Sequence, residues 1–412
     1  MFSRRVRNRI ISDSENSDDQ RETHVNSIYN TLSDDELPLS KRLDELQKER
    51  QWKIATVKEN FVPKIMKYTD NCSGVQSQSN ITENTSPTSI FKFFFNEDLV
   101  REIVENTNKY RRAKGQCRQR SSNKITFDDI YSFLAISIYM GIVQLPKTSM
   151  YWSTDPLYNF PLVRQAMNRK KFLEVQKYLH LSDIDNEDNN DKACKIRPVI
   201  DMLVQRFQKA YRPGQYVVVD ESLMLWKGRL SFKQFIPSKR ARFGLKSFVL
   251  CDSETSYAYN MKLYTGRMLE EWNDQSIGVS GSVVMDLSKN ILNQGRTMFL
   301  DNWYSSPALY EKLHKNGTNV CGTVRLKRKA MPCDEQVKNA KKTKKRRYDK
   351  RVVSTLTTAH TPRLEESIKI DRTTGDCIKK PNTVIDYNQY MGGVDRMDQI
   401  LQGCSSLRKS IK

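Results

Sequence analysis

Cysteine and histidine do not occur here in the patterns that zinc modules or disulfide frameworks require. The eight cysteines are scattered over 412 residues, no two of them form a C-x-x-C pair, and there are only four histidines. Zinc ribbons and disulfide-stapled folds depend on closely spaced cysteines. The sequence therefore indicates no zinc site in this chain, and it favours a reducing, intracellular setting.

A long apolar run that could cross a membrane is also missing. The strongest candidate, residues 130–145, has about the length of one buried helix and contains Ser132, Ser137 and Gln144. A bilayer crossing needs about 20 apolar residues. Thr126 and Asp129 before the run form a capping-box pattern, which predicts the start of a helix. We expect a core helix and no membrane partner.

Acidic residues are too few to balance the basic ones. The chain has 69 Lys and Arg against 48 Asp and Glu, a formal net charge of +21. Such an excess favours nucleic acid as a partner, although it could also serve solubility alone. Many of the cations gather in one segment: Lys338, Lys341, Lys342, Lys344, Lys345, Arg346, Arg347, Lys350 and Arg351. This run predicts either a nuclear-import signal or a phosphate contact, with a solvated loop as the plainer alternative.

The first half of the chain divides into a polar tail and a helical region. Residues 1–89 are polar, poor in aromatic residues and rich in acidic-serine tracts, which predicts disorder. Order should begin near Phe91. Helices are expected at 96–104 (ended by the polar residues 106–108), 130–145, 161–181 and 198–211. Residues 90–210 are therefore predicted to form a helical domain.

From residue 211 the pattern changes to short strands. Strands are expected at 216–220, 231–236, 246–251 and 258–264, and further ones at 297–301, 319–325 and 352–358. A helix from Pro307 to His314 separates two of them, which predicts a parallel β-α-β pair. The expected fold is α/β, with a catalytic core that begins at residues 211–325.

Three acidic positions follow short apolar stretches or a glycine pair. Asp220 ends Tyr216-Val217-Val218-Val219, Asp301 ends the strand 297–301, and Asp395 with Asp398 follows Gly392-Gly393. Carboxylates are the ligands that Mg²⁺ prefers, and sites with two metal ions use them to flank a scissile phosphate. Asp395 and Asp398 are spaced to share one helix face, although both could be capping acids of a helix N-terminus.

These stretches together resemble the piggyBac family of DDE transposases. The motifs that carry the resemblance are Val219-Asp220-Glu221-Ser222, Lys227-Gly228-Arg229, Gln234-Phe235-Ile236-Pro237-Ser238-Lys239, Gly244-Leu245-Lys246, Tyr264-Thr265-Gly266-Arg267, Asp301-Asn302-Trp303, Cys321-Gly322-Thr323-Val324-Arg325 and the stretch from Tyr387 to Gln399. The similarity covers about residue 91 to the end. It is the order of the motifs, rather than any one of them, that makes it specific.

The resemblance implies an RNase H-like core, a mixed sheet flanked by helices. A basic insertion domain at 326–383 would interrupt this core, and residues 384–412 would return to it. The helical domain 90–210 would then serve dimerisation and DNA binding. Implied partners are double-stranded DNA, meaning transposon ends and TTAA targets, and a second copy of the chain in a homodimer. The implied location is the nucleus.

The resemblance also implies roles for particular residues. Asp220, Asp301 and Asp395 would hold two Mg²⁺ or Mn²⁺ ions, and Asp398 would support them as a further catalytic acid. Glu221 should point to the opposite face of its strand and be structural. Candidate DNA contacts are Lys227, Arg229, Lys239, Lys246 and Arg325.

The implied activity is cut-and-paste transposition, with strand cleavage and transfer at TTAA sites. Relatives continue with a tryptophan-bearing helical segment and a cysteine-rich zinc module, which this sequence does not contain. The alternative is therefore a domesticated or truncated DNA-binding protein without transposase activity.

Overall fold

The computed structural model describes most of the chain beyond the N-terminal tail. The described residues are 62–114, 124–188, 190–226, 228–236, 242–266, 272–332, 353–370 and 375–403. The predictions made for residues 1–61, for the basic run 338–351 and for Lys227 and Lys239 lie outside these residues. They stay predictions.

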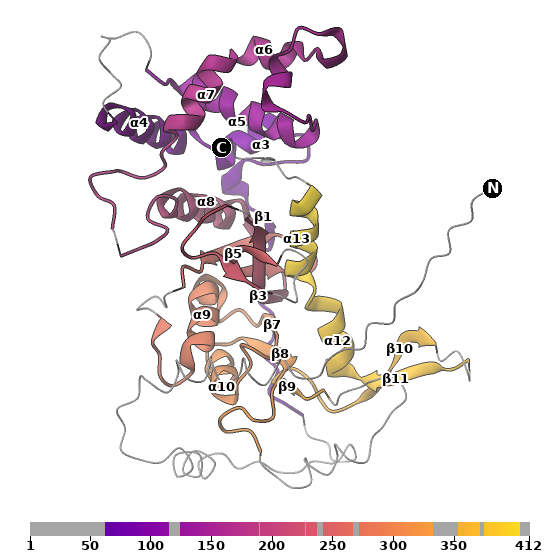
Figure 1. Ribbon diagram of the computed structural model, residues 1–412. Coiled ribbons are helices and arrows are strands. Elements are labelled where there is room, and N and C mark those ends of the chain that lie inside the picture. The colour runs from indigo at the N-terminus through magenta and orange to yellow at the C-terminus, as the bar shows by residue number, and fades with distance from the viewer. Residues whose placement is uncertain are drawn as a thin grey trace, which may run out of the picture. The chain divides into compact units, whose positions relative to one another are not determined.

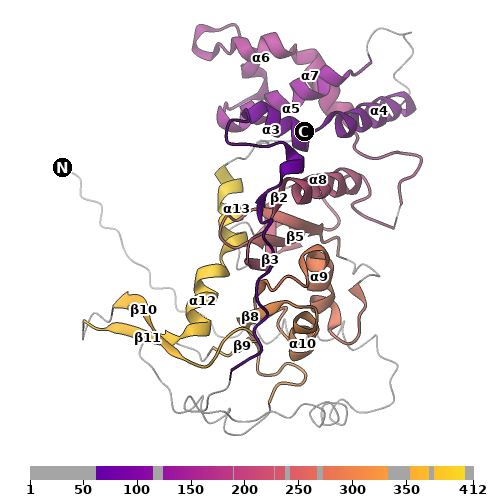
Figure 2. The same ribbon diagram turned by 180° about the vertical axis from the view of Figure 1, so that it is seen from behind.

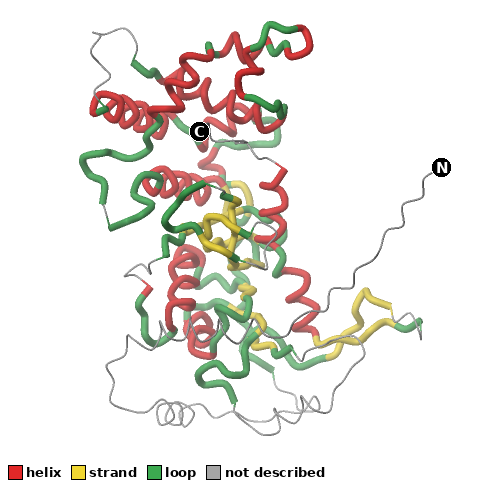
Figure 3. The backbone as a smooth tube through the Cα atoms, viewed as in Figure 1, coloured by secondary structure: helices red, strands yellow, loops and turns green. Residues whose placement is uncertain are grey.

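Residues 87–210 form helices, as expected. The helices are α3 (Pro87–Phe94), α4 (Glu97–Ala113), α5 (Phe127–Ile142), α6 (Pro161–Ala166), α7 (Arg169–Tyr178) and α8 (Arg197–Ala210), with short 3-10 helices η1 (Ser77–Ser79), η2 (Thr148–Trp152) and η3 (Pro156–Tyr158), drawn in red in Figure 3. Leu99, Ile130 and Phe172 belong to one buried apolar cluster that joins α4, α5 and α7. The predicted capping box is confirmed, because Thr126 and Asp129 bond reciprocally at the start of α5. None of the helices in the described part of the chain combines the length and apolar composition of a membrane span.

Two helix boundaries differ from the expectation. Helix α4 does not end at residues 106–108, and two of the polar side chains there, Thr107 and Asn108, have partners on other segments. The Thr107 hydroxyl donates to the carbonyl of His180 over 3.3 Å, and the Asn108 amide donates to the carbonyl of Ile125 over 2.8 Å. The helix predicted at 161–181 is divided into α6 and α7, where the Asn168 side chain caps the new N-terminus.

The second half of the chain builds one mixed sheet. Its strands are β3 (Tyr216–Leu225), β4 (Gln234–Phe235), β5 (Phe243–Asp252), β6 (Ala258–Leu263), β7 (Thr297–Leu300), β8 (Asn319–Thr323) and β9 (Thr355–Thr357). The order is β4-β5-β3-β7-β8-β9, with β6 also paired to β5. Strands β3, β5 and β6 are antiparallel, whereas β3, β7 and β8 are parallel. The predicted β-α-β pair is confirmed by β7 and β8, and the expected RNase H-like architecture agrees with this topology.

Alternate residues of β3 face two different layers. Val217 and Val219 pack with α9 (Gly278–Ser288), which the short 3-10 helix η5 (Lys289–Ile291) follows, and with α10 (Pro307–Lys315). Val218 packs on the other face, in a cluster that includes Val394. That face is covered by α12 (Asn382–Tyr390) and α13 (Gly393–Gly403), which Figure 1 draws in yellow beside the sheet. The sheet is therefore the middle of three layers.

The described part of the segment 326–383, for which the resemblance implied a basic insertion domain, contributes strands to two sheets. Strand β9 from this segment pairs with β8, and the Thr358 hydroxyl accepts from the Val320 N–H at 2.9 Å. Strands β10 (Leu364–Ile370) and β11 (Cys377–Pro381) make a two-stranded sheet of their own. The described part of the segment thus contributes an edge strand to the core and a hairpin outside it.

Ordered structure begins before Phe91. Residues 62–70 run extended along the starts of β7 and β8, visible as the indigo trace in Figure 2. The Asn319 side chain bonds both the N–H and the carbonyl of Met66, each at 2.8 Å. Strand β1 (Gly74–Val75) then pairs with β2 (Tyr211–Arg212). The polar composition of residues 1–89 predicted disorder. From residue 62 on, however, hydrogen bonds to the core hold the segment in place, although it has few hydrophobic residues of its own.

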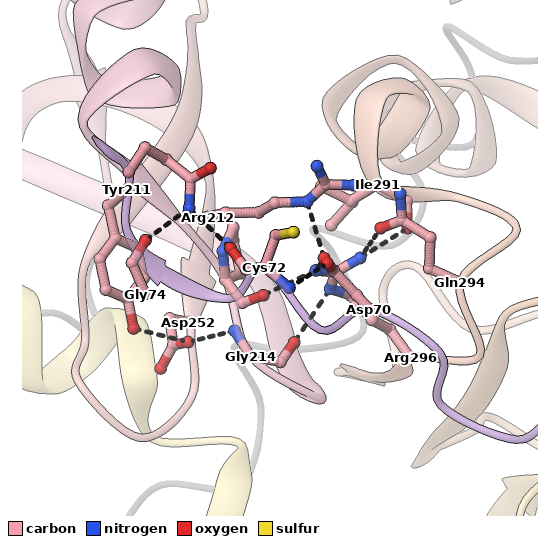
Figure 4. Close-up of polar contacts among 12 residues, drawn as sticks. Asp70, Cys72, Gly74, Tyr211, Arg212, Gly214, Asp252, Ile291, Gln294 and Arg296 are labelled. Atoms are coloured by element: carbon pink, nitrogen blue, oxygen red, sulfur yellow. Dashed lines mark hydrogen bonds and ion pairs between the residues drawn. The ribbon is translucent and has the colours of Figure 1, made fainter. Parts of the chain in front are cut away.

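A buried ion pair fastens this N-terminal segment. Arg296 is 0% exposed and Asp70 is 4% exposed, and Figure 4 shows the two side chains pointing toward each other. The Arg296 guanidinium also donates to the carbonyls of Pro213 at 2.7 Å and Gly214 at 2.9 Å. Arg212 adds a second cation, 2.7 Å from Asp70. A buried arginine is tolerated only with such a complete set of partners.

Candidate functional site

Asp220 and Asp301 lie on neighbouring strands at the same level of the sheet. The parallel pairing of β3 with β7 ends at Val219 and Leu300, so Asp220 and Asp301 are the next residue on each strand. Adjacent strands are about 4.8 Å apart. The structure thus brings together two acids separated by 81 positions in the sequence (301 − 220). They lie where β7 ends, the edge at which α/β sheets place ligands.

The environment of Asp301 disfavours its charge. Burial raises the pKa of Asp301 above its usual value, and the nearby Glu221 carboxylate raises it further. The Trp303 N–H, which donates to Asp301 over 2.7 Å, and the cation of Arg325 act in the opposite direction. A carboxyl group whose charge is disfavoured by its surroundings is stabilised by a bound positive ion.

A buried tyrosine, Tyr304, lies close to the same acidic residues. Tyr304 is fully buried, and among the described residues its hydroxyl has no hydrogen-bond partner. Burial raises the pKa of Tyr304 strongly, and the charges of Glu221, Asp220 and Asp301 add to the effect. The Tyr304 hydroxyl thus lies within reach of the charges of three carboxylates and lacks a hydrogen-bond partner among the described residues.

Glu221 lies on the other face of β3 from Asp220, as expected from the alternation of the strand. Its carboxylate pairs with Lys246 at 2.6 Å. The Lys246 ammonium also lies over the rings of Phe248, Tyr264 and Trp303, at 4.8 to 5.6 Å from their centres. Lys246, a predicted DNA contact, is therefore held by an anion and an aromatic cage.

Helix α13 carries the last two predicted acids, Asp395 and Asp398, to the Asp220 face of the sheet. Its approach requires Gly393, where a Cβ atom would lie 2.6 Å from Val218 Cγ1. Asp398 reaches β3, since the Ser222 hydroxyl donates to its Oδ1 over 2.6 Å. Asp395 lies in the first turn of α13 and is exposed. The helix predicted around these acids is confirmed.

Some of the residues at the acid site have the chemistry that a divalent ion requires. Asp220 and Asp301 offer hard oxygen ligands side by side, and the unpartnered Tyr304 hydroxyl lies near them. However, no group of three or more His, Cys, Asp or Glu side chains among the described residues is arranged to hold a metal ion. Of the three predicted ligands, Asp220 and Asp301 follow paired residues of β3 and β7, whereas Asp395 is exposed on α13. The acid of α13 that bonds Ser222 is Asp398, the predicted supporting residue.

The chain was compared with known families and proteins. The family model described as Transposase IS4 matches residues 86–412. The chain belongs to this family, the piggyBac-type transposases. Human PiggyBac transposable element-derived protein 3 is 28% identical over 344 residues, which is 76% of this chain and 55% of that protein. Human PiggyBac transposable element-derived protein 2 is 27% identical over 342 residues, 77% of this chain and 56% of that protein.

A solved structure agrees with the piggyBac-type assignment. A piggyBac transposase, determined by cryo-electron microscopy in a synaptic complex with hairpin DNA, superposes with a TM-score of 0.64. It is 26% identical in sequence, and the match covers 82% of this chain and 72% of that chain. The expected family and fold class are therefore confirmed. The chain spans about 55% of the length of the curated relatives it matches.

The predicted DNA contacts differ in how close they lie to the acids in this piggyBac-type fold. Arg325 is exposed, and its guanidinium donates to the Asn302 side chain beside Asp301 over 3.3 Å. Arg229 is exposed in the loop after β3. Of the predicted cations in the described part of the chain, Arg325 is the one brought against the acids by an identified contact, whereas Lys246 is engaged by Glu221.

Sequence reasoning missed two features of the sheet. The first is an exposed aromatic pair, Phe235 and Phe243, whose ring centres lie 4.6 Å apart with Lys233 over the second ring at 5.3 Å. The alternation of β4 and β5 could have indicated that these rings share one face. The second is Ser222, whose partner Asp398 lies 176 positions away. No local pattern could have predicted that contact.

Proposed function

We propose that this chain carries out DNA strand cleavage and transfer of the cut-and-paste type, at TTAA sites and with divalent metal ions. Asp220 and Asp301 would be the principal ligands, with Asp395 and Asp398 of α13 completing the site. The protein would act on double-stranded DNA in the nucleus, as a homodimer. The observation that carries the proposal is the register of β3 and β7, which puts Asp220 beside Asp301.

The carboxylates have distinct tasks in this scheme. Asp220 projects from a continuous strand and is a rigid ligand, whereas Asp301 lies in a turn where the Trp303 N–H orients one of its oxygens. Burial favours the protonated form of Asp301, and a cation close to it would favour release of the proton. When bound, Mg²⁺ or Mn²⁺ would supply a Lewis acid that activates the attacking oxygen and stabilises the leaving one.

Surface aromatic and basic side chains support a nucleic-acid substrate. The Phe235 and Phe243 rings present a surface on which an unpaired base can stack, and Lys233 adds a charge for the backbone. Arg325 offers a cation beside Asp301. The related transposase is in complex with hairpin DNA, and a DNA end bent or opened in this way exposes bases for stacking.

A second function has its own support. Because the described residues contain no group of three metal-binding side chains, the chain could bind DNA without cutting it. This domesticated DNA-binding protein would keep the basic and aromatic surface, and it would not depend on Asp220.

Calorimetric titration with Mn²⁺ distinguishes the two functions. The full chain is measured beside Asp220→Ala and Asp301→Ala, with Asp286→Ala, an acid on α9 paired to Lys262, as the control. The transposase proposal expects saturable binding that both site variants lose and the control keeps. If the unaltered chain binds no Mn²⁺ but still shifts hairpin DNA in a gel, the DNA-binding alternative holds.

A further inference from the structure

The contact between Ser222 and Asp398 joins two motifs that are far apart in the chain. Ser222 lies two residues after Asp220 on β3, and therefore on the same face of the sheet. It is 8% exposed. Its hydroxyl donates to the Asp398 carboxylate at 2.6 Å, a distance typical of a strong bond to a charged acceptor.

Helix α13 has other anchors, so Ser222 is not needed to dock it. Val394 is fully buried against the sheet, and Gly393 lies directly on Val218. Arg396 donates to the carbonyl of Ser253 and to the hydroxyl of Ser256, the latter at 3.1 Å. These contacts fix the first turns of the helix. The Ser222 bond acts one turn later, on a side chain that could otherwise rotate away from β3.

Asp398 and Asp220 also approach a common neighbour. Burial raises the pKa of the Cys251 thiol, and the carboxylates of Asp398, Asp252 and Asp220 raise it further. Cys251 lies on β5 in the apolar cluster beneath α13. Asp398 and Asp220 are thus both close enough to Cys251 to act on its thiol, and a hydroxyl two residues from Asp220 bonds Asp398.

From this geometry we infer that Ser222 is a positioning residue, which orients Asp398 as a carboxylate of the acid site. The inference rests on the proposed metal-dependent function. Carboxylates that bind metals are themselves held by hydrogen bonds from a surrounding layer of residues, and loss of such a bond weakens metal affinity by about 10- to 100-fold. Ser222 supplies a bond of this kind from the strand to Asp398 Oδ1.

The test compares Ser222→Ala with Ser222→Thr, which keeps the hydroxyl. Ser247 is the matched control, because it is a buried serine directly opposite Ser222 on β5. For each full-length variant, Mn²⁺ affinity is measured by calorimetry and the melting temperature by circular dichroism. We expect Ser222→Ala to bind Mn²⁺ about 10- to 100-fold more weakly, with a melting temperature close to that of Ser247→Ala. Ser222→Thr should recover the affinity.

Each other outcome has a distinct meaning. If Ser222→Ala lowers the melting temperature far more than Ser247→Ala does but leaves Mn²⁺ affinity unchanged, or if it fails to fold, the bond is a structural tie and the inference is overturned. An affinity equal to that of the unaltered chain overturns it as well. In these cases the proposed function survives if Asp220→Ala and Asp301→Ala still abolish binding. If those two variants bind Mn²⁺ normally, the proposed function itself fails.

Discussion

The Asp70–Arg296 pair should be among the most costly ion pairs to break in the described part of this chain. Asp70→Ala removes the carboxylate and leaves the Arg296 guanidinium at 0% exposure, with carbonyl oxygens but no anion. Breaking a buried pair by removing one partner costs about 3–5 kcal/mol. We expect the lower end, about 3 kcal/mol, because the carbonyls remain and because Arg212 is exposed enough to turn toward water.

Urea denaturation followed by circular dichroism measures this cost. The midpoint should fall while the slope stays unchanged, since the same surface becomes exposed on unfolding. Glu366→Ala is the control, because its pair with Lys379 spans 4.0 Å and both side chains are about two-thirds exposed; it should change stability by less than about 0.5 kcal/mol. A loss below about 1 kcal/mol for Asp70→Ala would refute the reasoning, as would an Asp70→Ala/Arg296→Met double variant no more stable than the single one.

The same pair predicts a pH dependence. Burial alone would raise the pKa of Asp70, but hydrogen bonds from the Cys72 N–H and the Arg296 guanidinium hold that pKa below its usual value. An acid with a depressed folded-state pKa stabilises the fold fully above its unfolded-state pKa of about 3.9, and this stabilisation disappears as the pH falls through the folded-state value. Asp70→Asn should therefore flatten the acid limb of the stability curve, and an unchanged limb would contradict this assignment.

Three further variants test other parts of the structure. Gly393→Ala should destabilise the chain by about 1–2 kcal/mol, because the new methyl group meets Val218 Cγ1 at 2.6 Å and overpacking outweighs the better helix propensity of alanine; urea denaturation measures the loss. Thr126→Ala should cost about 1 kcal/mol in the same assay, since it removes the cap that bonds the Asp129 N–H. Phe235→Ala should weaken binding to hairpin DNA by about 1–3 kcal/mol without changing the salt dependence, because it removes a stacking surface and no charge.

Controls for these variants are available in the chain. Gly403→Ala places its methyl group in open space and should not destabilise; an equal loss at both glycines would show that packing on Val218 is not the cause. Leu157→Ala removes an exposed apolar side chain of η3 and should leave DNA binding unchanged. A salt slope that changes with Phe235→Ala would indicate a charge effect in place of stacking.

Local patterns predicted most of the element types and several of their ends. The capping box of Thr126 and Asp129 and the strands before Asp220 and Asp301 depend on neighbours within a few residues, so the sequence alone was sufficient. The family could also be identified from the sequence, because each of its motifs is a short local stretch and the motifs occur in a fixed order. The β-α-β crossover then required β7 and β8 to be parallel, and thereby placed Asp301 at a strand end.

The tertiary structure decided the rest, because it depends on partners far away in the chain. Thr107 and Asn108 lie inside α4, where the carbonyls of His180 and Ile125 accept from their side chains. Residues 62–80 are ordered through hydrogen bonds with the core and one buried arginine, which composition could not reveal. The sequence determined that Asp220 and Asp301 each follow an apolar stretch, although β3 continues through Asp220 to Leu225 where the predicted strand ended at residue 220. Only the packing of α13 decided that Asp398 meets Ser222, because hydrogen bonds between distant segments depend on how helices and sheets pack together.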